Sequence, residues 1–364
     1  MTPVGIGLIG AGMIHRIYAE NLRRIPGARL VAVADQDPAR TEAAAAAWEA
    51  RAVSVEALLA DPAIHAVLNL TPPQAHAAVS QAIIAAGKHV YSEKPLAVTV
   101  PEAEALLAAA AARGVRVGCA PDTFLGAGIQ TARKALDDGW IGTPLAGLAL
   151  MLGHGPDTWH PHAEFFYAPG AGPLFDVGPY YLTALVTLLG PIRRVWGAAR
   201  QSGPRRILAG PRAGDVIPVA TPTHVAAQLE FAAGPLVTLV TSFDVWATET
   251  PRIEIYGSEG TLAVPDPNTF GGPVRVRRAQ QDSWATLPLV HAWTENCRGL
   301  GLADLLAAEA QGRPHRAHGA LALHVLEAMA GILHAHETGT WVTLTTTVER
   351  PAPLGPAPTW RDLT

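Results

Sequence analysis

Short apolar runs alternate with alanine-rich helical stretches through the first third of the chain. We predict strands over Ile6–Ile9, Leu30–Ala34, Ala66–Asn69, His89–Ser92 and Val115–Cys119, and helices over Ile14–Arg24, Pro38–Ala50, Gln74–Ala86 and Pro101–Arg113. Prolines stand at or near the expected helix starts, and glycines follow the expected helix ends. Strand and helix repeated in this order predict a parallel, doubly wound α/β sheet.

The hydrophobic pattern changes after Pro121. Longer alternating runs predict strands over Leu145–Leu152, Ile192–Arg200, His224–Phe231, Leu236–Phe243, Arg252–Tyr256 and Val274–Arg277. Helices are expected at Gly126–Asp137, Pro179–Leu189, Leu300–Gln311 and His318–Glu337. This half is therefore expected to be an α/β domain with a large, mostly antiparallel open sheet and helices on one side. The expected boundaries are residues 1–121, 122–345 and a proline-rich C-terminal tail, 346–364.

Length and composition narrow the class of protein. A chain of 364 residues fits two domains, and 49% hydrophobic against 16% charged residues allows a sizeable core. The net charge is -4 without a basic stripe, which argues against nucleic acid and membrane partners. Cys119 and Cys297 form no disulfide or zinc pattern, and we expect no signal peptide from the first residues, which lack a basic segment. These features predict a cytoplasmic protein without a membrane span.

A glycine-rich turn follows the first predicted strand. Gly10 permits a tight turn, and Gly12 lets the backbone approach a pyrophosphate, which then lies on the N–H groups of the helix start at Met13 and Ile14. His15 occupies the place of a third glycine. The alternative is a glycine-rich strand end without a ligand.

Asp35 ends the second predicted strand, where an acidic side chain holds the adenosine ribose diol. Its charge repels a 2′-phosphate and no arginine follows directly, which predicts NAD, with NADP possible. Asp35 and Asp37 also suit helix caps, and we assign the cap to Asp37. Thr71 and Pro72, after the strand ending at Asn69, are expected in the same crevice. An ordinary proline-led helix start is the alternative for Thr71 and Pro72.

Taken together, these residues resemble the Gfo/Idh/MocA family, named for glucose–fructose oxidoreductase and inositol dehydrogenase. The residues that carry the likeness are Gly10-Ala11-Gly12, Asp35, Thr71-Pro72 with His76, Ala86-Gly87-Lys88-His89-Val90 and Glu93-Lys94-Pro95, followed by Gly172–Tyr180. The resemblance implies a Rossmann domain and a second domain whose sheet lines the substrate site. It also implies a homodimer or homotetramer and NAD(P)-linked chemistry on sugars or polyols.

The same resemblance makes Lys94, Asp176 and Tyr180 the catalytic and substrate-binding candidates, and adds His76, Glu93 and Lys94 to the cofactor site. Tyr180 stands where many relatives have histidine. A helix N-terminus and the Lys94 ammonium would lower the tyrosine pKa from its ordinary value of about 10. Tyr180 or Lys94 would then exchange the hydroxyl proton, and Asp176 would hold Lys94 charged or orient the substrate. The alternatives are that Lys94 is a surface lysine, that Asp176 is a helix cap and that Tyr180 is a buried packing residue.

A polar loop, His154–Glu164, contains three histidines, two acidic residues and a tryptophan. Its spacing is irregular and prolines interrupt it, so we predict no metal. We expect instead that the loop closes over a hydroxylated ligand. Trp159 would stack on a sugar face, and His160 would hydrogen-bond its hydroxyl groups.

These features predict an NAD(P)-dependent oxidoreductase that transfers a hydride between nicotinamide and a sugar, polyol or sugar-derived carbonyl. One alternative is a glycosidase-type enzyme that retains NAD and makes no net redox change. Another is a non-catalytic dinucleotide-binding sensor, although a sensor has no need of a proton-transfer set such as Lys94, Asp176 and Tyr180.

Overall fold

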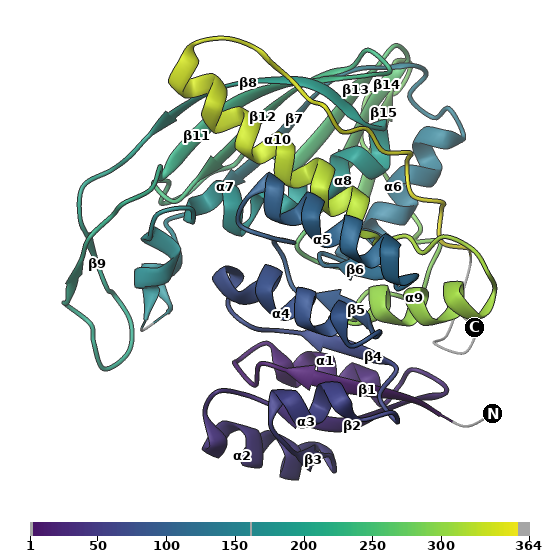
Figure 1. The fold of residues 1–364 in the computed structure, drawn as a ribbon. Coiled ribbons are helices and arrows are strands. Elements are labelled where there is room, and N and C mark those ends of the chain that lie inside the picture. Colours follow the sequence, from purple (N-terminus) through teal and green to yellow (C-terminus); the bar gives the residue numbers. More distant parts are fainter. Residues whose placement is uncertain (1–2, 161, 356–364) are drawn as a thin grey trace. The chain divides into compact units, whose positions relative to one another are not determined.

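The computed structural model describes residues 3–160 and 162–355, which form two compact units (Figure 1). Unit 1 comprises the described chain up to Gly126, the segment His291–Leu326 and the described chain from Pro351. Unit 2 comprises Ala127–Val290 and Glu327–Arg350. This division differs from the expected boundaries, because helix α9 (Leu300–Ala310) belongs to unit 1 and not to the domain expected over 122–345.

Unit 1 contains a six-stranded sheet in the order β3-β2-β1-β4-β5-β6, with every neighbouring pair parallel. The strands are β1 (Val4–Ile9), β2 (Ala28–Ala34), β3 (Arg51–Ala52), β4 (Ala66–Asn69), β5 (His89–Ser92) and β6 (Val117–Cys119). Every residue of β4 and β5 is buried. Because successive side chains point to opposite faces, both faces of the sheet are covered, which confirms the predicted doubly wound fold.

Some helices of this unit begin or end at residues that suit a helix terminus. The helices that connect the strands of its sheet are α1 (His15–Leu22), α2 (Pro38–Trp48), α3 (Val55–Ala60), α4 (Pro73–Ala85) and α5 (Val100–Arg113). Asp37 caps α2 by accepting hydrogen bonds from the N–H groups of Ala39 and Arg40, as predicted. Gly114 ends α5 in the left-handed region with φ +67°. The short elements β3 and α3 were not predicted.

A buried carboxylate attaches α9 to this unit. Asp122 is 1% exposed, and its Oδ2 atom accepts hydrogen bonds from the N–H groups of Gly299 at 2.8 Å and Gly301 at 3.0 Å. These groups lie at the N-terminus of α9, where helix N–H groups lack partners within the helix. Asp122 therefore satisfies donors that would otherwise be buried without a partner.

Unit 2 contains a nine-stranded sheet in the order β16-β15-β14-β13-β7-β12-β11-β8-β17. The strands are β7 (Pro144–Leu152), β8 (Ile192–Arg200), β11 (His224–Phe231), β12 (Leu236–Ser242), β13 (Ile253–Gly257), β14 (Gly260–Val264), β15 (Val274–Arg278), β16 (Ala285–Leu287) and β17 (Val342–Thr343). Of the strand pairs described, β7 with β12 is parallel and the others are antiparallel. The predicted large, mostly antiparallel sheet is confirmed. A separate ribbon pairs β9 (Arg205–Arg206) with β10 (Val216–Ile217).

Helices of this unit pack on one side of the large sheet (Figure 1). They are α6 (Ala127–Asp137), α7 (Gly172–Asp176), α8 (Gly178–Leu189) and the C-terminal part of α10 (Gly319–Thr338). Every residue of α8 is buried. Along β11, buried and half-buried residues alternate, so one face of the sheet supports the core and the other remains partly open.

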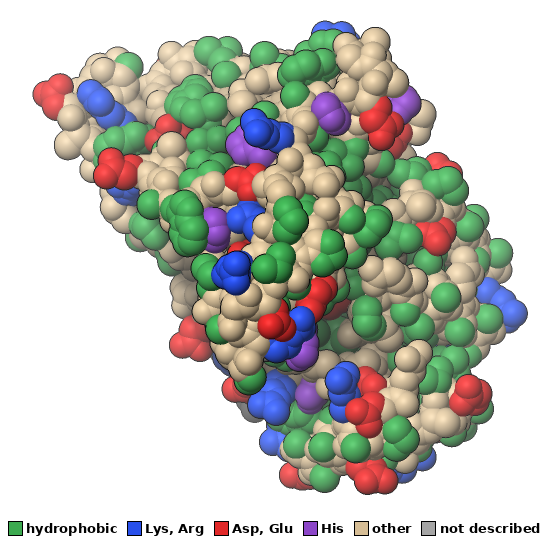
Figure 2. Space-filling model, turned by 90° about the vertical axis from the view of Figure 1, so that its left-hand side faces the viewer, with side chains coloured by type: hydrophobic (Ala, Val, Ile, Leu, Met, Phe, Trp, Pro, Cys, Tyr) green, Lys and Arg blue, Asp and Glu red, His purple; other side chains and the backbone are tan. Residues whose placement is uncertain are grey.

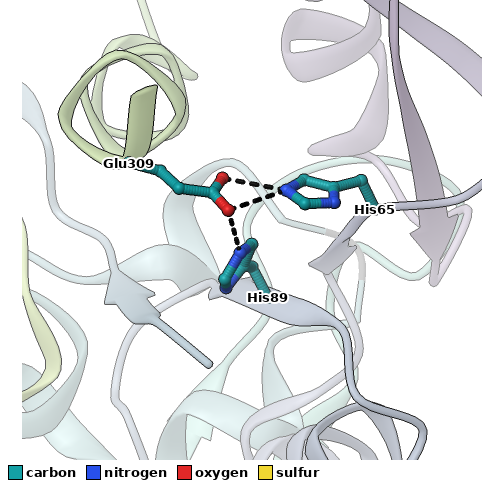
Figure 3. A group of neighbouring side chains, drawn as sticks. All are labelled: His65, His89 and Glu309. Atoms are coloured by element: carbon teal, nitrogen blue, oxygen red, sulfur yellow. Dashed lines mark hydrogen bonds and ion pairs between the residues drawn. The ribbon is translucent and has the colours of Figure 1, made fainter. Parts of the chain in front are cut away.

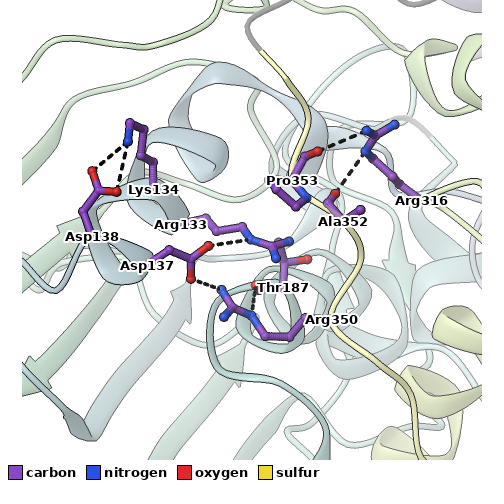
Figure 4. A network of polar contacts seen from close by, with 9 residues as sticks. All are labelled: Arg133, Lys134, Asp137, Asp138, Thr187, Arg316, Arg350, Ala352 and Pro353. Carbon is purple, nitrogen blue, oxygen red and sulfur yellow. Dashed lines mark hydrogen bonds and ion pairs between the residues drawn. The ribbon is translucent and has the colours of Figure 1, made fainter.

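Arginines hold the C-terminal segments (Figure 4). In unit 2, Arg350 donates to Asp137 Oδ1 at 2.8 Å and to the carbonyl oxygen of Thr187 at 3.0 Å. In unit 1, Arg316 donates to the carbonyl oxygens of Ala352 and Pro353, each at 3.0 Å. The described start of the proline-rich tail is thus packed, and its last two prolines lie outside the described residues.

Acidic and basic side chains are interspersed among uncharged ones on the face drawn in Figure 2. Cys119 and Cys297 are buried free thiols. Among the residues with described positions, none of the helices has the length and apolar character needed to span a membrane.

Burial raises the pKa of Asp122 from 3.8 to about 6. The folded chain therefore holds this proton more tightly than the unfolded chain, so the associated stability is full at acidic pH and is lost as pH rises through about 6. Asp122→Asn keeps an oxygen for both glycine N–H groups but cannot titrate. We expect the free energy of unfolding of the wild type, relative to Asp122→Asn, to fall by about 3 kcal/mol as the pH rises from below 3.8 to above about 6. Urea unfolding at a series of pH values measures it, and a constant difference would contradict the assignment.

Candidate functional site

The turn after β1 lies very close to the backbone that follows β4. Gly10 has φ +100°, and a Cβ atom there would lie 2.6 Å from the carbonyl carbon and oxygen of Leu70. Both the left-handed conformation and the lack of space require glycine. The fold therefore requires glycine at position 10 whether or not a ligand binds.

Gly12 has a different environment. A Cβ atom at this position would meet nothing within 4 Å, and its φ lies outside the left-handed region. The open space adjoins the N-terminal end of α1, where Met13 is 75% exposed. Helix-start N–H groups beside a bare backbone form a cradle for an anionic group, so these residues fit the pyrophosphate of a dinucleotide.

Asp35 holds the glycine turn from the end of β2. Its Oδ2 atom accepts the Ala11 N–H at 2.7 Å, and its Oδ1 atom accepts the Asp37 N–H at 2.9 Å. The cap of α2 comes from Asp37, so the carboxylate of Asp35 lies beside the turn and not in the helix cap. A carboxylate oxygen has more than one lone pair, so Asp35 keeps acceptor capacity for a ribose hydroxyl.

The loop after β4 is fixed by a buried amide. Asn69 Oδ1 accepts the hydroxyl of Thr71 at 2.7 Å, and Asn69 Nδ2 donates to Ser80 Oγ at 2.9 Å and to the carbonyl oxygen of His76 at 3.0 Å. Pro72 directly precedes α4. The loop that carries Thr71 is therefore held to both β4 and α4.

His76, in the first turns of α4, is fully buried. Its Nδ1 atom lies 2.6 Å from the carbonyl oxygen of Pro95, and its Nε2 atom lies 2.7 Å from the carbonyl oxygen of Thr71. Sequence reasoning placed His76 at the cofactor site without foreseeing these contacts. Protein atoms engage both ring nitrogens and leave neither for a ligand.

Glu93 supports Lys94 after β5. Glu93 Oε2 accepts the backbone N–H of Lys94 at 3.0 Å, and Glu93 Oε1 accepts the Tyr18 hydroxyl at 2.7 Å. Burial and the Glu93 charge raise the pKa of Tyr18, so it remains a phenol that donates. The peptide between Lys94 and Pro95 is cis. Sequence reasoning missed Tyr18, because a tyrosine within a helix carries no signal of a partner so distant along the chain.

The acidic and tyrosine candidates of unit 2 lie on two successive helices. Asp176 is the last residue of α7, and Tyr180 is in the first turn of α8, with Val177 between the helices. Val177 accepts the backbone N–H of Tyr180 at 3.1 Å, and Tyr180 is 8% exposed. The predicted helix start between the two residues is confirmed. Lys94 belongs to unit 1, so the two units contribute different candidates.

The polar loop after β7 forms two 3-10 turns, Pro156–Thr158 and Ala163–Tyr167. Asp157 is buried and accepts the Tyr167 hydroxyl, and Glu164 pairs with Arg212. Trp159 is 59% exposed and contacts the ring of His160 at 5.3 Å between centroids. Both acids have protein partners, whereas Trp159 presents an aromatic face to solvent.

A cluster that the sequence did not suggest lies at the opposite end of the parallel sheet (Figure 3). His65 and His89 precede or begin the adjacent strands β4 and β5, and both Nε2 atoms contact the Glu309 carboxylate of α9, at 2.8 and 2.7 Å. His89 Nδ1 accepts the Arg116 N–H at 2.8 Å, so the ring proton is on Nε2. A metal on Nε2 would move that proton to Nδ1, against the Arg116 N–H. This tautomer favours a hydrogen-bonded cluster over a metal site.

Comparisons with known proteins agree with this architecture. Residues 4–120 match a family described as an oxidoreductase family with an NAD-binding Rossmann fold, and residues 129–263 match the GFO/IDH/MocA C-terminal domain. The chain is 32% identical over 289 residues to dTDP-3,4-didehydro-2,6-dideoxy-alpha-D-glucose 3-reductase of Streptomyces antibioticus, covering 74% of this chain and 86% of that one. It is 27% identical to inositol 2-dehydrogenase of Rhizobium meliloti, covering 79% and 82%. An NAD-binding oxidoreductase from Klebsiella pneumoniae has the same fold, with a TM-score of 0.81, 24% identity, and coverage of 94% and 99%.

The two glycines of the turn offer a matched test. Gly12→Ala places a methyl group in open space, so we expect an unchanged melting temperature but a rise of at least about tenfold in the Kd for NADH. Gly10→Ala forces a left-handed alanine against Leu70, and we expect a loss of about 2 kcal/mol or more in stability. Calorimetric melting and NADH fluorescence titration measure the two effects. Unchanged NADH affinity in a folded Gly12→Ala protein would place the pyrophosphate elsewhere.

Proposed function

The protein belongs to the GFO/IDH/MocA family of oxidoreductases with an NAD-binding Rossmann fold, and from this premise we propose that it transfers a hydride between nicotinamide and a sugar, a polyol or a sugar-derived carbonyl. The observation that carries the proposal is a lysine anchored two residues after strand β5 of the parallel sheet. Glu93 holds the N–H of Lys94 at 3.0 Å, and the next residue, Pro95, is tied to His76. The names of the relatives, an inositol dehydrogenase and two reductases of sugar derivatives, support this substrate class.

We assign the cofactor site to Gly10, Gly12, Met13, Ile14, Asp35, Thr71, Pro72 and Glu93 of unit 1. The open cradle at Gly12 supports the pyrophosphate position, and Asp35 supports ribose recognition. When bound, the nicotinamide would accept or supply the hydride. The protein residues then have to bind the cofactor, orient the substrate and move the hydroxyl proton.

Lys94, Asp176 and Tyr180 are proposed to act on the same substrate hydroxyl. Oxidation removes a hydride from carbon and a proton from oxygen, and Tyr180 or Lys94 takes that proton. Tyr180 lies in the first turn of α8, where the helix N-terminus carries partial positive charge that would stabilise negative charge on a nearby oxygen. Asp176 would hold Lys94 charged or orient the hydroxyl.

Trp159 and His160 are proposed to bind the substrate. An exposed indole face suits the C–H face of a sugar ring, and the neighbouring imidazole offers hydrogen bonding to hydroxyl groups. The fold leaves the identity of the sugar to such loop side chains.

Variants at the proton-transfer candidates test the proposed reaction. Lys94→Ala and Tyr180→Phe are each expected to bind NADH but to lower kcat by about a hundredfold or more on the best substrate of a polyol and sugar panel. The controls Lys134→Ala, at an exposed lysine paired with Asp138, and Tyr181→Phe, next to Tyr180, are expected to retain activity.

The double variant Lys94→Ala/Tyr180→Phe separates shared from independent action. If both residues serve one proton transfer, the double variant should cost about as much as the more damaging single variant. If the decreases in kcat of the two single variants multiply in the double variant, the two residues do not share one step. Full activity in Lys94→Ala would remove Lys94 from the mechanism altogether.

Asp35 should determine the choice between NAD and NADP. Asp35→Asn removes the charge that repels a 2′-phosphate, so the ratio of kcat/KM for NAD to that for NADP is expected to fall about tenfold. Asp37→Asn is the matched control, because asparagine also caps helices and Asp37 faces α2. Steady-state rates with both cofactors measure the ratio. An equal change in both variants would contradict a specific role for Asp35.

A further inference from the structure

Among the described residues, the hydrogen-bond contacts of the His76 ring are two acceptors and no donor. Carbonyl oxygens of Pro95 and Thr71 lie 2.6 Å from Nδ1 and 2.7 Å from Nε2. A backbone carbonyl only accepts hydrogen bonds, and a neutral imidazole carries one N–H. In the neutral ring, one of these short contacts would therefore set a nitrogen lone pair against an oxygen lone pair. The imidazolium satisfies both contacts.

Burial, hydrogen bonds and nearby charges shift the pKa of His76 in opposite directions. The net effect of these surroundings lowers the pKa of His76; burial is the largest cause, and the Lys94 charge adds to it. The two carbonyl hydrogen bonds and the Glu93 carboxylate raise the pKa. Because both nitrogen–oxygen distances are short hydrogen-bond distances, the geometry selects the protonated ring, with Glu93 as the compensating negative charge.

Each carbonyl belongs to a segment that is also anchored on its other side. The Thr71 hydroxyl and N–H are both bound to Asn69, at 2.7 and 3.3 Å. The Lys94 N–H is bound to Glu93 at 3.0 Å, and Glu93 is itself held by Tyr18. The ring of His76 therefore connects two loops that would otherwise be joined to the sheet separately.

We propose that His76 is a positioning residue which, as an imidazolium, ties the loop at Thr71 to the backbone at Pro95 and so fixes the backbone that carries Lys94. The inference rests on the proposed function only for the catalytic role of Lys94. It changes the part that the sequence suggested for His76, from direct cofactor contact to support of two site loops. Loss of the ring should displace Lys94 without removing any group that contacts NADH.

The protonation state is measured on the wild-type full chain by NMR with 15N-labelled histidine, with ring signals assigned by through-bond correlation. His315 is the internal control, because it is also buried but has a single described carbonyl contact, Val117 at 3.0 Å from Nε2. Burial lowers the pKa of His315 to about 4, so it is neutral near pH 7. We expect two protonated ring nitrogens for His76 and one for His315. One protonated nitrogen for His76 would overturn the proposal.

Kinetics tests the positioning role separately. His76→Gln keeps one donor and is expected to lower kcat about a hundredfold while the Kd for NADH changes by less than about tenfold. His315→Gln removes a buried histidine of the same unit and is expected to leave kcat within about threefold. A His76→Gln protein with wild-type kcat would overturn the proposal. If Lys94→Ala proves active while His76 shows two ring protons, the function of Lys94 fails and the imidazolium clamp stands.

Discussion

The candidate site depends on how unit 1 satisfies the polar groups buried at the carboxyl edge of its parallel sheet. Strands β1, β4 and β5 end side by side there, and the chain leaves the regular hydrogen-bonding ladder after their last residues. Asn69 compensates by binding Thr71 and the start of α4, and Glu93 compensates by binding Lys94. Glu93, a proposed cofactor residue, thus also helps to satisfy the polar groups of this edge.

The residues at this edge are under different constraints. Gly10 is required by the backbone of Leu70, whereas Gly12 is bare although no protein atom demands it. Asp35 supports the turn through Ala11 and still has lone pairs to offer. Gly10 is thus needed to build the turn, whereas Gly12 leaves room for a ligand. We therefore expect substitutions at Gly10 to affect stability most and substitutions at Gly12 to affect ligand binding most.

The order of strands and helices in unit 1 was predictable because apolar runs, proline starts and glycine ends all agree there. The residues Arg51–Ala52 were missed because a two-residue exposed edge strand has no apolar run. The assignment of α9 to unit 1 rests on Asp122 and two distant glycine N–H groups, a contact without a local signal. At the site, the place of Asp35 at the end of a predicted strand pointed to ribose recognition, and the family resemblance pointed to Lys94. The contacts of His76 and the support from Tyr18 depend on tertiary structure and have no local signal. The roles of Lys94, Asp176 and Tyr180 stay predictions.

The most direct test of the central claim is isotope transfer. The protein is incubated with NAD and a panel of polyols and sugars deuterated at carbon, and the recovered nicotinamide is examined by mass spectrometry. Hydride transfer from carbon predicts that the nicotinamide gains deuterium from at least one compound and that Lys94→Ala abolishes the gain. Tight NADH binding without deuterium transfer from any compound would contradict the account and favour a dinucleotide-binding protein without this chemistry.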